Sequence, residues 1–385
     1  MTGSLVWLAY GAALLLAVHL ATILLAISAM TRRAAPDSRR DRPGISVVRP
    51  VCGLEHQLEQ TLTSTFQVDY PDYEILFCAG ASDDAAIPLV QRLIAQHPGI
   101  PARLLIGDDK ISGNPKLNNC VKGWHAAHHD LILLSDSNVL LPPDTLTRLL
   151  AAWTPGTGLV SSPPIGVQPQ GFWAHLECAF LNSFQARWQL ASARIDTGFA
   201  QGKMLLWDKS VLERAGGITV LGREMAEDVA STKVVRAAGL KVRLPGRFFE
   251  QLVGPRSFDA VWRRQVRWAR VRRLGFLLVF LPEVFAGAAF PFLALLALVA
   301  GGLTPWSIPV ALLVWYGAEY VMARIGNWPH SAADIAAWGL RDLLLPALWL
   351  ACWTSSSFEW RGTAMTAKEI SAHIADDATA PKPGA

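Results

Sequence analysis

The sequence predicts an α/β catalytic domain, wound like a nucleotide-binding fold around a mostly parallel sheet and flanked by apolar membrane helices. Strand-like and helix-like segments alternate from residue 45 to residue 135, as in parallel sheets. An apolar run over residues 5–30 is long enough to cross about 30 Å of hydrocarbon. More apolar runs follow beyond residue 275. Together these observations favour a membrane-anchored α/β enzyme.

The N-terminal apolar run predicts a transmembrane helix. Five of the next twelve residues, 31–42, are arginine, beginning with Arg32 and Arg33. The positive-inside rule then places this side, and the domain that follows, in the cytoplasm. A cleaved signal peptide is the alternative, and it is disfavoured because the charges follow the apolar run.

Four strands and three helices are expected in the first part of the domain. The strands are predicted at residues 45–50, 73–79, 102–106 and 130–135, and the helices at residues 54–66, 85–95 and 117–127. Ligand residues of such folds lie at the carboxyl ends of strands. The segments Ser82-Asp83-Asp84 and Asp136-Ser137-Asn138 both occupy such positions.

The later part of the chain predicts a membrane-associated region. Residues 172–190 form an expected helix whose aromatic stripe suits either a core or an apolar substrate surface. Residues 257–274 predict a basic amphipathic helix at the headgroups. Apolar segments follow at 276–300, 308–322 and 336–353. The last contains Arg341 and Asp342, which are costly in lipid, so it is expected to be interfacial or re-entrant.

Composition excludes several classes of protein. Hydrophobic residues make up 51% and charged residues 17%, unlike an ordinary soluble protein. The net charge is +4 without a long basic tract, which argues against nucleic acid as a partner. The five cysteines are scattered, without zinc or disulfide spacing.

The acidic residues suggest a nucleotide and a metal site. Asp84, with Asp83 beside it, is placed to accept hydrogen bonds from a nucleotide; the alternative is a turn or helix cap. Asp136 is placed to anchor Mg²⁺ or Mn²⁺, with Asn138 as a weaker oxygen ligand. A turn-forming Asp-Ser-Asn is the alternative there. Lys116 is a candidate contact for phosphate.

A candidate general base and a cationic helical face complete the set of predicted site residues. Asp228 opens an expected helix and is the candidate general base, with a helix cap as the alternative. One base without a protein nucleophile implies single displacement with inversion. Arg264, Arg267 and Trp268 share one helical face, where arginine grips diphosphate or lipid headgroups.

A series of motifs runs in a fixed order from about residue 45 to residue 369. They are Asp69-Tyr-Pro-x-Tyr-Glu-Ile-Leu, Asp83-Asp84-x-Ala, Gly113-Asn-Pro-Lys-x-Asn-Asn, Asp136-Ser-Asn, Ala215-Gly-Gly, Ala226-Glu-Asp228, Arg264-x-x-Arg-Trp and Trp360-Arg-Gly. On these motifs the chain resembles the ceramide glucosyltransferase family, membrane members of the wider GT-A, cellulose-synthase-like glycosyltransferases. The resemblance implies a UDP-sugar donor, a divalent metal and a lipid acceptor. It gives Asp84, Asp136 and Asp228 the roles of the family's first, second and presumed basic aspartates.

Two departures from animal members bear on the substrates. Residues 182–190 lack an expected His-Pro pair, and Gln201-Gly-Lys203 replaces the segment near the acceptor site. These differences resemble bacterial relatives, some of them associated with hopanoid biosynthesis and an N-acetylglucosamine-type sugar. In well-studied members the sugar is glucose and the acceptor is ceramide.

The expected activity is transfer of a hexose from a UDP-sugar to the hydroxyl of a membrane lipid, in a bacterial inner membrane with the catalytic domain cytoplasmic. A processive polysaccharide synthase and a non-catalytic, nucleotide-sugar-binding scaffold are the alternatives. The expected division is a transmembrane helix (1–30), a basic linker (31–44), the GT-A domain (45–255), an interfacial helix (256–275), C-terminal spans (276–356) and a tail (357–385).

Overall fold

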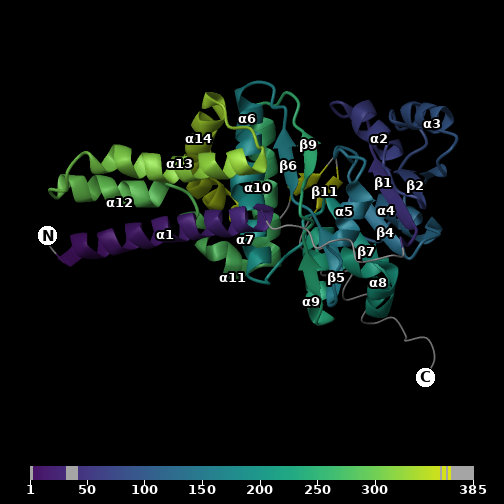
Figure 1. Ribbon diagram of the computed structural model, residues 1–385, viewed down its shortest axis with the longest axis horizontal. Helices are drawn as coiled ribbons and strands as arrows, with labels where there is room; N and C mark the ends of the chain where they lie inside the picture. The colour runs from purple at the N-terminus through teal and green to yellow at the C-terminus, as the bar shows by residue number, and fades with distance from the viewer. Residues whose placement is uncertain (1–2, 32–41, 356–357, 361–362, 366–385) are drawn as a thin grey trace. The chain divides into compact units, whose positions relative to one another are not determined.

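A seven-stranded sheet in the order β3-β2-β1-β4-β7-β5-β8 carries the candidate site in the computed structural model (Figure 1). The structure describes residues 3–31, 42–355, 358–360 and 363–365. The strands of this sheet are β1 (Ile45–Val51), β2 (Tyr73–Ala79), β3 (Ala102–Ile106), β4 (Leu131–Ser135), β5 (Thr157–Ser161), β7 (Met204–Asp208) and β8 (Lys241–Arg243). The four strands expected from the sequence all form, within one residue of their expected ends.

The sheet is mixed but mostly parallel, as expected. β1 pairs in parallel with β2 and β4, and β2 pairs in parallel with β3. β7 is the exception, because it runs antiparallel to both β4 and β5. Every residue of β1, β2 and β4 is buried. Strands that are buried along their whole length are typical of a parallel sheet that is covered on both faces.

Helices cover both faces of this sheet. They are α2 (Leu58–Phe66), α3 (Ile87–Gln96), α4 (Pro115–Ala126), α5 (Thr145–Ala151), α8 (Lys209–Ala215), the 3₁₀ helix η2 (Ile218–Arg223) and α9 (Glu227–Ala237). One core joins α2, α3 and α5 to the sheet, and a second joins α4, α8 and α9 to it. Helix α4 packs especially close, because a Cβ atom on Gly123 would lie 2.6 Å from Val48 Cγ1. This close packing holds α4 against strands β1 and β2.

Two helices begin later than the sequence predicts. Helix α2 starts at Leu58 rather than at Leu54, because Gln57 adopts a left-handed conformation with φ of 54° and Leu54 is exposed. Helix α3 starts at Ile87 rather than at residue 85, because the carboxylate of Asp84 holds the preceding turn. In contrast, α4 starts two residues early, where Asn114 caps it and Pro115 occupies its first turn.

The chain divides into two compact units. Unit 1 comprises Met1–Arg32, Ile165–Asp196 and Leu252–Thr354, and unit 2 comprises Arg33–Pro164, Thr197–Gln251 and Ser355–Ala385. The seven-stranded sheet belongs to unit 2. Two pairs of short strands complete the described set: β6 (Pro164–Val167) with β9 (Phe249–Leu252), and β10 (Phe358–Trp360) with β11 (Thr363–Met365). Most of the basic linker, Arg361-Gly362 of the last motif, and the tail beyond residue 365 lie outside the described residues.

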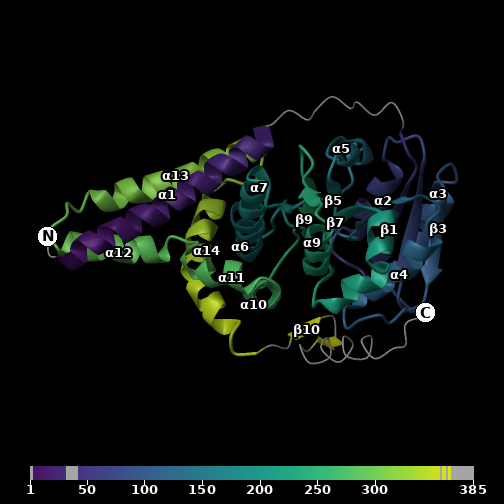
Figure 2. The same cartoon turned by 90° about the horizontal axis from the view of Figure 1, so that it is seen from below.

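Unit 1 is helical. It consists of α1 (Gly3–Thr31), α6 (Phe172–Ala179), the π-helix η1 (Phe180–Ala186), α7 (Arg187–Arg194), α10 (Phe258–Gly275), α11 (Leu277–Phe280), the 3₁₀ helix η3 (Leu281–Phe285), α12 (Ala289–Ala300), α13 (Ser307–Gly326) and α14 (Ala332–Ala351). Both views show α1, α12 and α13 side by side (Figures 1 and 2). The helix expected at 172–190 extends to Arg194, with a π-helical turn in its middle.

Three helical segments are long and apolar enough to cross a membrane, within the part of the chain that the structure describes. They are Gly3–Thr31, Leu277–Ala300 and Ser307–Gly326. The second is broken into α11, η3 and α12, where Pro282 falls in the first turn of η3. Helix α14 is not among these segments, and its expected interfacial or re-entrant placement stays a prediction.

The charges of α14 are paired inside unit 1. Arg341 Nη2 donates to Glu319 Oε1 of α13 at 2.8 Å and to Asp342 Oδ1 at 2.7 Å. It also donates to the hydroxyl of Ser183. The side chains of Arg341, Glu319 and Asp342 are at most 2% exposed. Because burial of an unpaired charge is very costly, this network ties α14 to α13 and η1.

Candidate active site

Lys116 lies at the centre of the candidate site in unit 2. Its ammonium group is 2.5 Å from Asp136 Oδ1 and 2.6 Å from Glu227 Oε1, and it donates to the carbonyl of Gly202. Burial alone would lower the pKa of Lys116, but the two carboxylates reverse the shift and hold that pKa above its ordinary value. A permanently charged lysine therefore joins segments that are far apart in the sequence.

The start of α4 positions Lys116. Asn114 Oδ1 accepts hydrogen bonds from the backbone amides of Lys116 and Leu117, at 3.0 and 3.2 Å, which satisfies two free donors of the helix end. The same side chain donates from Nδ2 to Glu227 Oε2 at 2.7 Å. Asn114 thus fixes the helix and one of the carboxylates that the helix lysine binds.

Asp136 follows β4, and its backbone is fixed from two sides. Its amide donates to the carbonyl of Lys203, at 3.0 Å, directly before the antiparallel strand β7. Arg49, which is fully buried in β1, donates to the carbonyls of Ser137 and Val139 at 3.0 Å each. The turn that carries Asp136 and Asn138 is therefore held by a guanidinium group beneath it, a role for Arg49 that the sequence did not indicate.

Lys203 reaches the free side of this turn. Its ammonium group lies 2.7 Å from Asp136 Oδ2 and 3.0 Å from Asn138 Oδ1. Burial alone would raise the pKa of Asp136, but Lys116 and Lys203 hold that pKa far below its usual range. Asp136 is thus ionised at every physiological pH.

The first turn of α9 supplies Glu227 and Asp228. The Oδ2 atom of Asp228 accepts from the amide of Gly202 at 3.1 Å, and Oδ1 accepts from the amide of Val229 at 2.8 Å. Burial, reinforced by the charge of Glu227, raises the pKa of Asp228 from 3.8 to about 7. A carboxyl group with such a pKa can exchange a proton near neutral pH, as a general base must.

Gly202 is packed directly against this cluster. A Cβ atom at this position would lie 2.5 Å from Glu227 Oε1 and 3.4 Å from the ammonium of Lys116. Its carbonyl and amide meanwhile bind Lys116 and Asp228. The Gln201-Gly-Lys203 segment is therefore part of the site, although the sequence indicated it only as a departure from a family pattern.

Asp84 lies at the carboxyl end of the neighbouring strand β2. Its two oxygens accept from the amide of Gly53, at 2.9 and 3.1 Å, and Oδ1 also accepts from Ala86 at 2.8 Å. The adjacent Asp83 is exposed. Asn119 Nδ2 binds the carbonyls of Val51 and Cys78, which end β1 and β2. Asp84 therefore braces the loop after β1, and a nucleotide role for it stays a prediction.

Arg264, Arg267 and Trp268 lie on α10, in unit 1. Arg264 Nη1 pairs with Glu177 Oε1 of α6 at 2.6 Å, and the arginine lies over the ring of Trp268 with 5.7 Å to its centroid. Trp268 itself packs against a small apolar cluster that includes Ala174 and Leu181. Within unit 1 these residues tie α10 to α6. Their expected role toward diphosphate stays a prediction.

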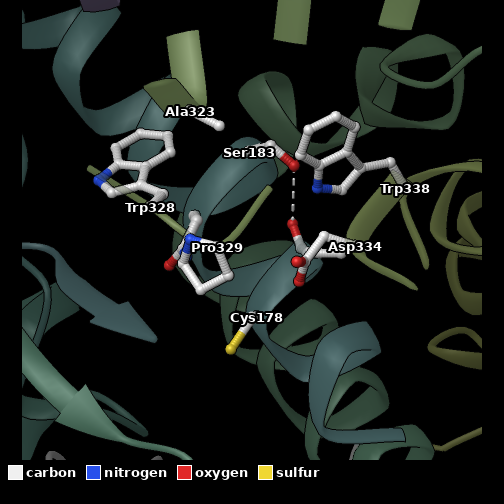
Figure 3. A pocket seen from close by; sticks show the side chains of 9 residues that line it. Cys178, Ser183, Ala323, Trp328, Pro329, Asp334 and Trp338 are labelled. Atoms are coloured by element: carbon white, nitrogen blue, oxygen red, sulfur yellow. Dashed lines mark hydrogen bonds between the residues drawn. The ribbon is translucent and has the colours of Figure 1, made fainter. Parts of the chain in front are cut away.

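Unit 1 also contains a small pocket beside α6 and η1 (Figure 3). The side chains around it are those of Cys178, Asn182, Ser183, Trp328, Pro329, Asp334 and Trp338, with Ala179 and Ala323. Asp334 Oδ1 lies 2.6 Å from His175 Nδ1, and Oδ2 accepts from the amide and hydroxyl of Ser331. Both oxygens of this acid are thus engaged in holding the start of α14.

The donor atoms of Asp136 and Asn138 suit a hard divalent cation. A carboxylate oxygen and an amide oxygen converge on one positive group, the ammonium of Lys203. Oxygen donors of these two kinds are those that Mg²⁺ and Mn²⁺ prefer. No cluster of three or more His, Cys, Asp or Glu side chains occurs among the described residues. The oxygens of Asp136 and Asn138 are thus the pair whose chemistry fits such a cation, and their metal role stays a prediction.

Comparison with known proteins decides the family. The model of the family described as Glycosyl transferase family 21 matches residues 12–372, nearly the whole chain. The chain belongs to glycosyl transferase family 21. Family membership agrees with the resemblance inferred from the motifs. Residues of three of those motifs meet in unit 2, where Lys116 binds Asp136 and Glu227.

Similar proteins include two ceramide glucosyltransferases of Caenorhabditis elegans. Ceramide glucosyltransferase 1 is 29% identical over 257 residues, which are 66% of this chain and 55% of that protein. Ceramide glucosyltransferase 3 is 26% identical over 329 residues, 83% of this chain and 72% of that protein. The match therefore spans little more than half the length of the first relative.

A solved structure supports the fold of this family 21 chain. It is the mannosyltransferase PcManGT from Pyrobaculum calidifontis, determined in complex with GDP-Man and Mn²⁺, with a TM-score of 0.55 and 18% identity. The superposition covers 87% of this chain and 99% of that one. The likeness confirms the GT-A-like α/β fold expected from the alternation of strands and helices.

Proposed function

We propose that this family 21 protein transfers a hexose from a UDP-sugar to the hydroxyl of a membrane lipid, with inversion at the anomeric carbon. The observation that supports this best is Asp228, whose pKa of about 7 makes it a base at neutral pH. It lies beside Glu227 on α9 and accepts from Gly202, next to the Lys116–Asp136 pair. A base beside a cationic, oxygen-rich site suits attack on a nucleoside diphosphate sugar.

The reaction is a single displacement. The acceptor oxygen forms a bond to the anomeric carbon as the bond from that carbon to the diphosphate oxygen breaks. The acceptor proton passes to Asp228, and the electron pair leaves with UDP. Because the nucleophile is the acceptor itself and attacks opposite the leaving group, the product has inverted configuration.

The remaining residues hold the donor. Asp136 and Asn138 would hold a divalent cation, which when bound neutralises the diphosphate leaving group. Lys116 keeps Asp136 and Glu227 in place through its two ion pairs. Asp84, with Asp83 next to it, would accept hydrogen bonds from the nucleotide. Arg264, Arg267 and Trp268 would bind diphosphate from α10.

The substrates and the cellular side are inferred from the relatives and the helices. The Caenorhabditis elegans relatives are named for transfer of glucose to ceramide, so glucose is the first candidate for the sugar and a ceramide-like lipid is the first candidate for the acceptor. The Gln201-Gly-Lys203 segment supports the alternative of an N-acetylglucosamine-type sugar and a hopanoid acceptor. Three apolar helices support a membrane location, and we place the catalytic domain in the cytoplasm of a bacterium.

A donor-by-acceptor assay tests this function. Full-length protein in detergent, with Mn²⁺ or Mg²⁺, is given UDP-glucose, UDP-galactose or UDP-N-acetylglucosamine with ceramide, diacylglycerol or a hydroxylated hopanoid. UDP release and lipid mass are followed. We expect a lipid carrying one sugar, and no product from Asp136→Asn or Asp228→Asn protein whose melting temperature is retained. A polymeric product would favour a processive synthase, and failure to bind UDP with Mn²⁺ would favour a scaffold.

A further inference from the structure

Lys203 occupies the point on which the oxygens of Asp136 and Asn138 converge. Its ammonium lies 2.7 Å from the carboxylate and 3.0 Å from the amide oxygen, and the lysine side chain is 15% exposed. Its backbone is fixed opposite the same turn, because Asp136 N donates to Lys203 O at 3.0 Å. The contact thus follows from the register of β4 and β7, in which Ser135 faces Met204.

We propose that Lys203 is a resident counter-ion: it yields this position when a divalent cation binds and then pairs with the diphosphate of the donor. Cation and nucleotide would therefore bind cooperatively. The inference rests on the proposed function, because it takes the Asp136–Asn138 pair as the metal-binding pair.

The charges of the cluster support such an exchange. Lys116 and Lys203 balance Asp136 and Glu227, so the resting site is already close to neutral. A dication that entered alone would leave uncompensated positive charge in a largely buried place, which is costly. A diphosphate that arrives with the cation restores the balance, and it gives the displaced ammonium a new anionic partner.

The side chain of lysine suits this movement. Its ammonium sits at the end of four flexible methylene groups, so it can shift by several ångströms while the backbone carbonyl keeps its hydrogen bond from the amide of Asp136. Lys116 differs, because its ammonium is shared by Asp136, Glu227 and the carbonyl of Gly202. The two lysines that contact Asp136 thus differ. Lys116 stays fixed, whereas the ammonium of Lys203 can be replaced by a divalent cation.

The test is a binding cycle for Mn²⁺ and UDP on full-length protein in detergent. The dissociation constant for Mn²⁺ is measured by electron paramagnetic resonance, with and without saturating UDP. In the wild type we expect UDP to tighten Mn²⁺ binding by about tenfold or more, which corresponds to about 1.4 kcal/mol of coupling. In Lys203→Met we expect Mn²⁺ to bind about tenfold tighter without UDP, and UDP to tighten it much less.

Two control variants test whether a change in the coupling between Mn²⁺ and UDP comes from the ammonium of Lys203. Lys203→Arg keeps the charge and the donors and should retain most of the coupling. Lys233→Met also removes one positive charge from unit 2, but that lysine pairs with Glu224, so the coupling should not change. Equal coupling in the wild type and in Lys203→Met would overturn the proposal while leaving the proposed function intact. A wild type that binds neither UDP nor Mn²⁺ would overturn both.

A second measurement applies if Lys203→Met does not fold. Reductive methylation of wild-type protein, read by mass spectrometry, reports how accessible each lysine is. Mn²⁺ alone at saturating concentration should increase methylation of Lys203, because the ammonium leaves Asp136, while Lys116 stays protected. Unchanged methylation of Lys203 in the Mn²⁺-loaded protein would contradict the exchange.

Discussion

The ammonium group of Lys116 lies 2.5 Å from the Oδ1 atom of Asp136, and this ion pair joins the first turn of α4 to the turn after β4. Glu227, from the first turn of α9, binds the same ammonium. Three elements that start or end at one edge of the sheet are therefore held together by one positive charge. Its removal would leave two carboxylates close together in a largely buried place.

Lys116→Met should destabilise the protein strongly. Loss of one partner of a buried ion pair costs about 3–5 kcal/mol, because the remaining charge stays buried. The melting temperature of the full chain in detergent measures the effect. Lys233→Met is the matched control: its pair with Glu224 is largely exposed and should contribute about 1 kcal/mol or less. Similar losses in the two variants would contradict the central role of Lys116.

The rate of the transfer reaction should decrease at acidic pH, because Asp228 must be deprotonated to act as the base. With a pKa of about 7, the carboxylate that accepts the proton is lost below neutral pH, so the rate should fall about tenfold per pH unit below 7 and level off above it. Asp228→Asn should abolish the rate. Initial rates between pH 5 and pH 9 would show this, and a rate that is independent of pH in this range would rule out Asp228 as the base.

The same carboxyl group should make stability depend on pH. Its pKa in the folded protein, about 7, lies above its ordinary value of 3.8, so the folded state holds a proton that the unfolded chain releases. Stability should therefore decrease as the pH rises from about 4 to about 7. Asp228→Asn removes this contribution, so its melting temperature should decline less over that range than that of the wild type.

Gly202→Ala should inactivate the enzyme. The added methyl group would press on Glu227 Oε1 at 2.5 Å and displace the ammonium of Lys116, so the whole cluster must shift. Gly80→Ala is the matched control at the end of β2, because no heavy atom lies within 4 Å of its Cβ position. Transfer rates and melting temperatures of both variants measure the difference. Full activity of Gly202→Ala would show that the cluster tolerates displacement.

Arg341→Met should destabilise unit 1. The substitution leaves Glu319 and Asp342 buried without their counter-charge, at a cost of about 3–5 kcal/mol. Arg324→Met, at an exposed position near the end of α13, is the control and should have little effect. In the double variant Arg341→Met with Glu319→Gln, part of the loss should be recovered, because one of the two buried charges is gone. Thermal unfolding in detergent would measure all three.

The first strands of the sheet could be predicted closely because their signal is local. Residues 73–79 are apolar except for Glu74, and β2 occupies the same residues. The start of α2 could not be predicted in this way. The apolar spacing from Leu54 to Phe66 suits a helix throughout, but the left-handed backbone of Gln57 delays its start to Leu58, and nothing in the local pattern indicates that turn.

The candidate site could be predicted only in part, because its contacts are not local. Asp136 and Asp228 were indicated by their position after a strand and before a helix. The roles of Arg49 and Lys203 depend on strand pairing across the sheet, and the antiparallel insertion of β7 between β4 and β5 has no local signature. Glu227 was part of a motif, but only the structure shows it bound to Lys116 and Asn114.

The division of unit 2 into separate stretches has a consequence for synthesis on the ribosome. Lys116 and Asp136 emerge early, whereas Lys203 and Asp228 emerge only after Ile165–Asp196, a segment of unit 1, has been made. Since β7 lies between β4 and β5, the nascent sheet stays incomplete until then. The cluster around Lys116 therefore cannot assemble before Asp228 has left the exit tunnel, so the proposed sugar transfer must wait until more than half of the polypeptide is outside the ribosome.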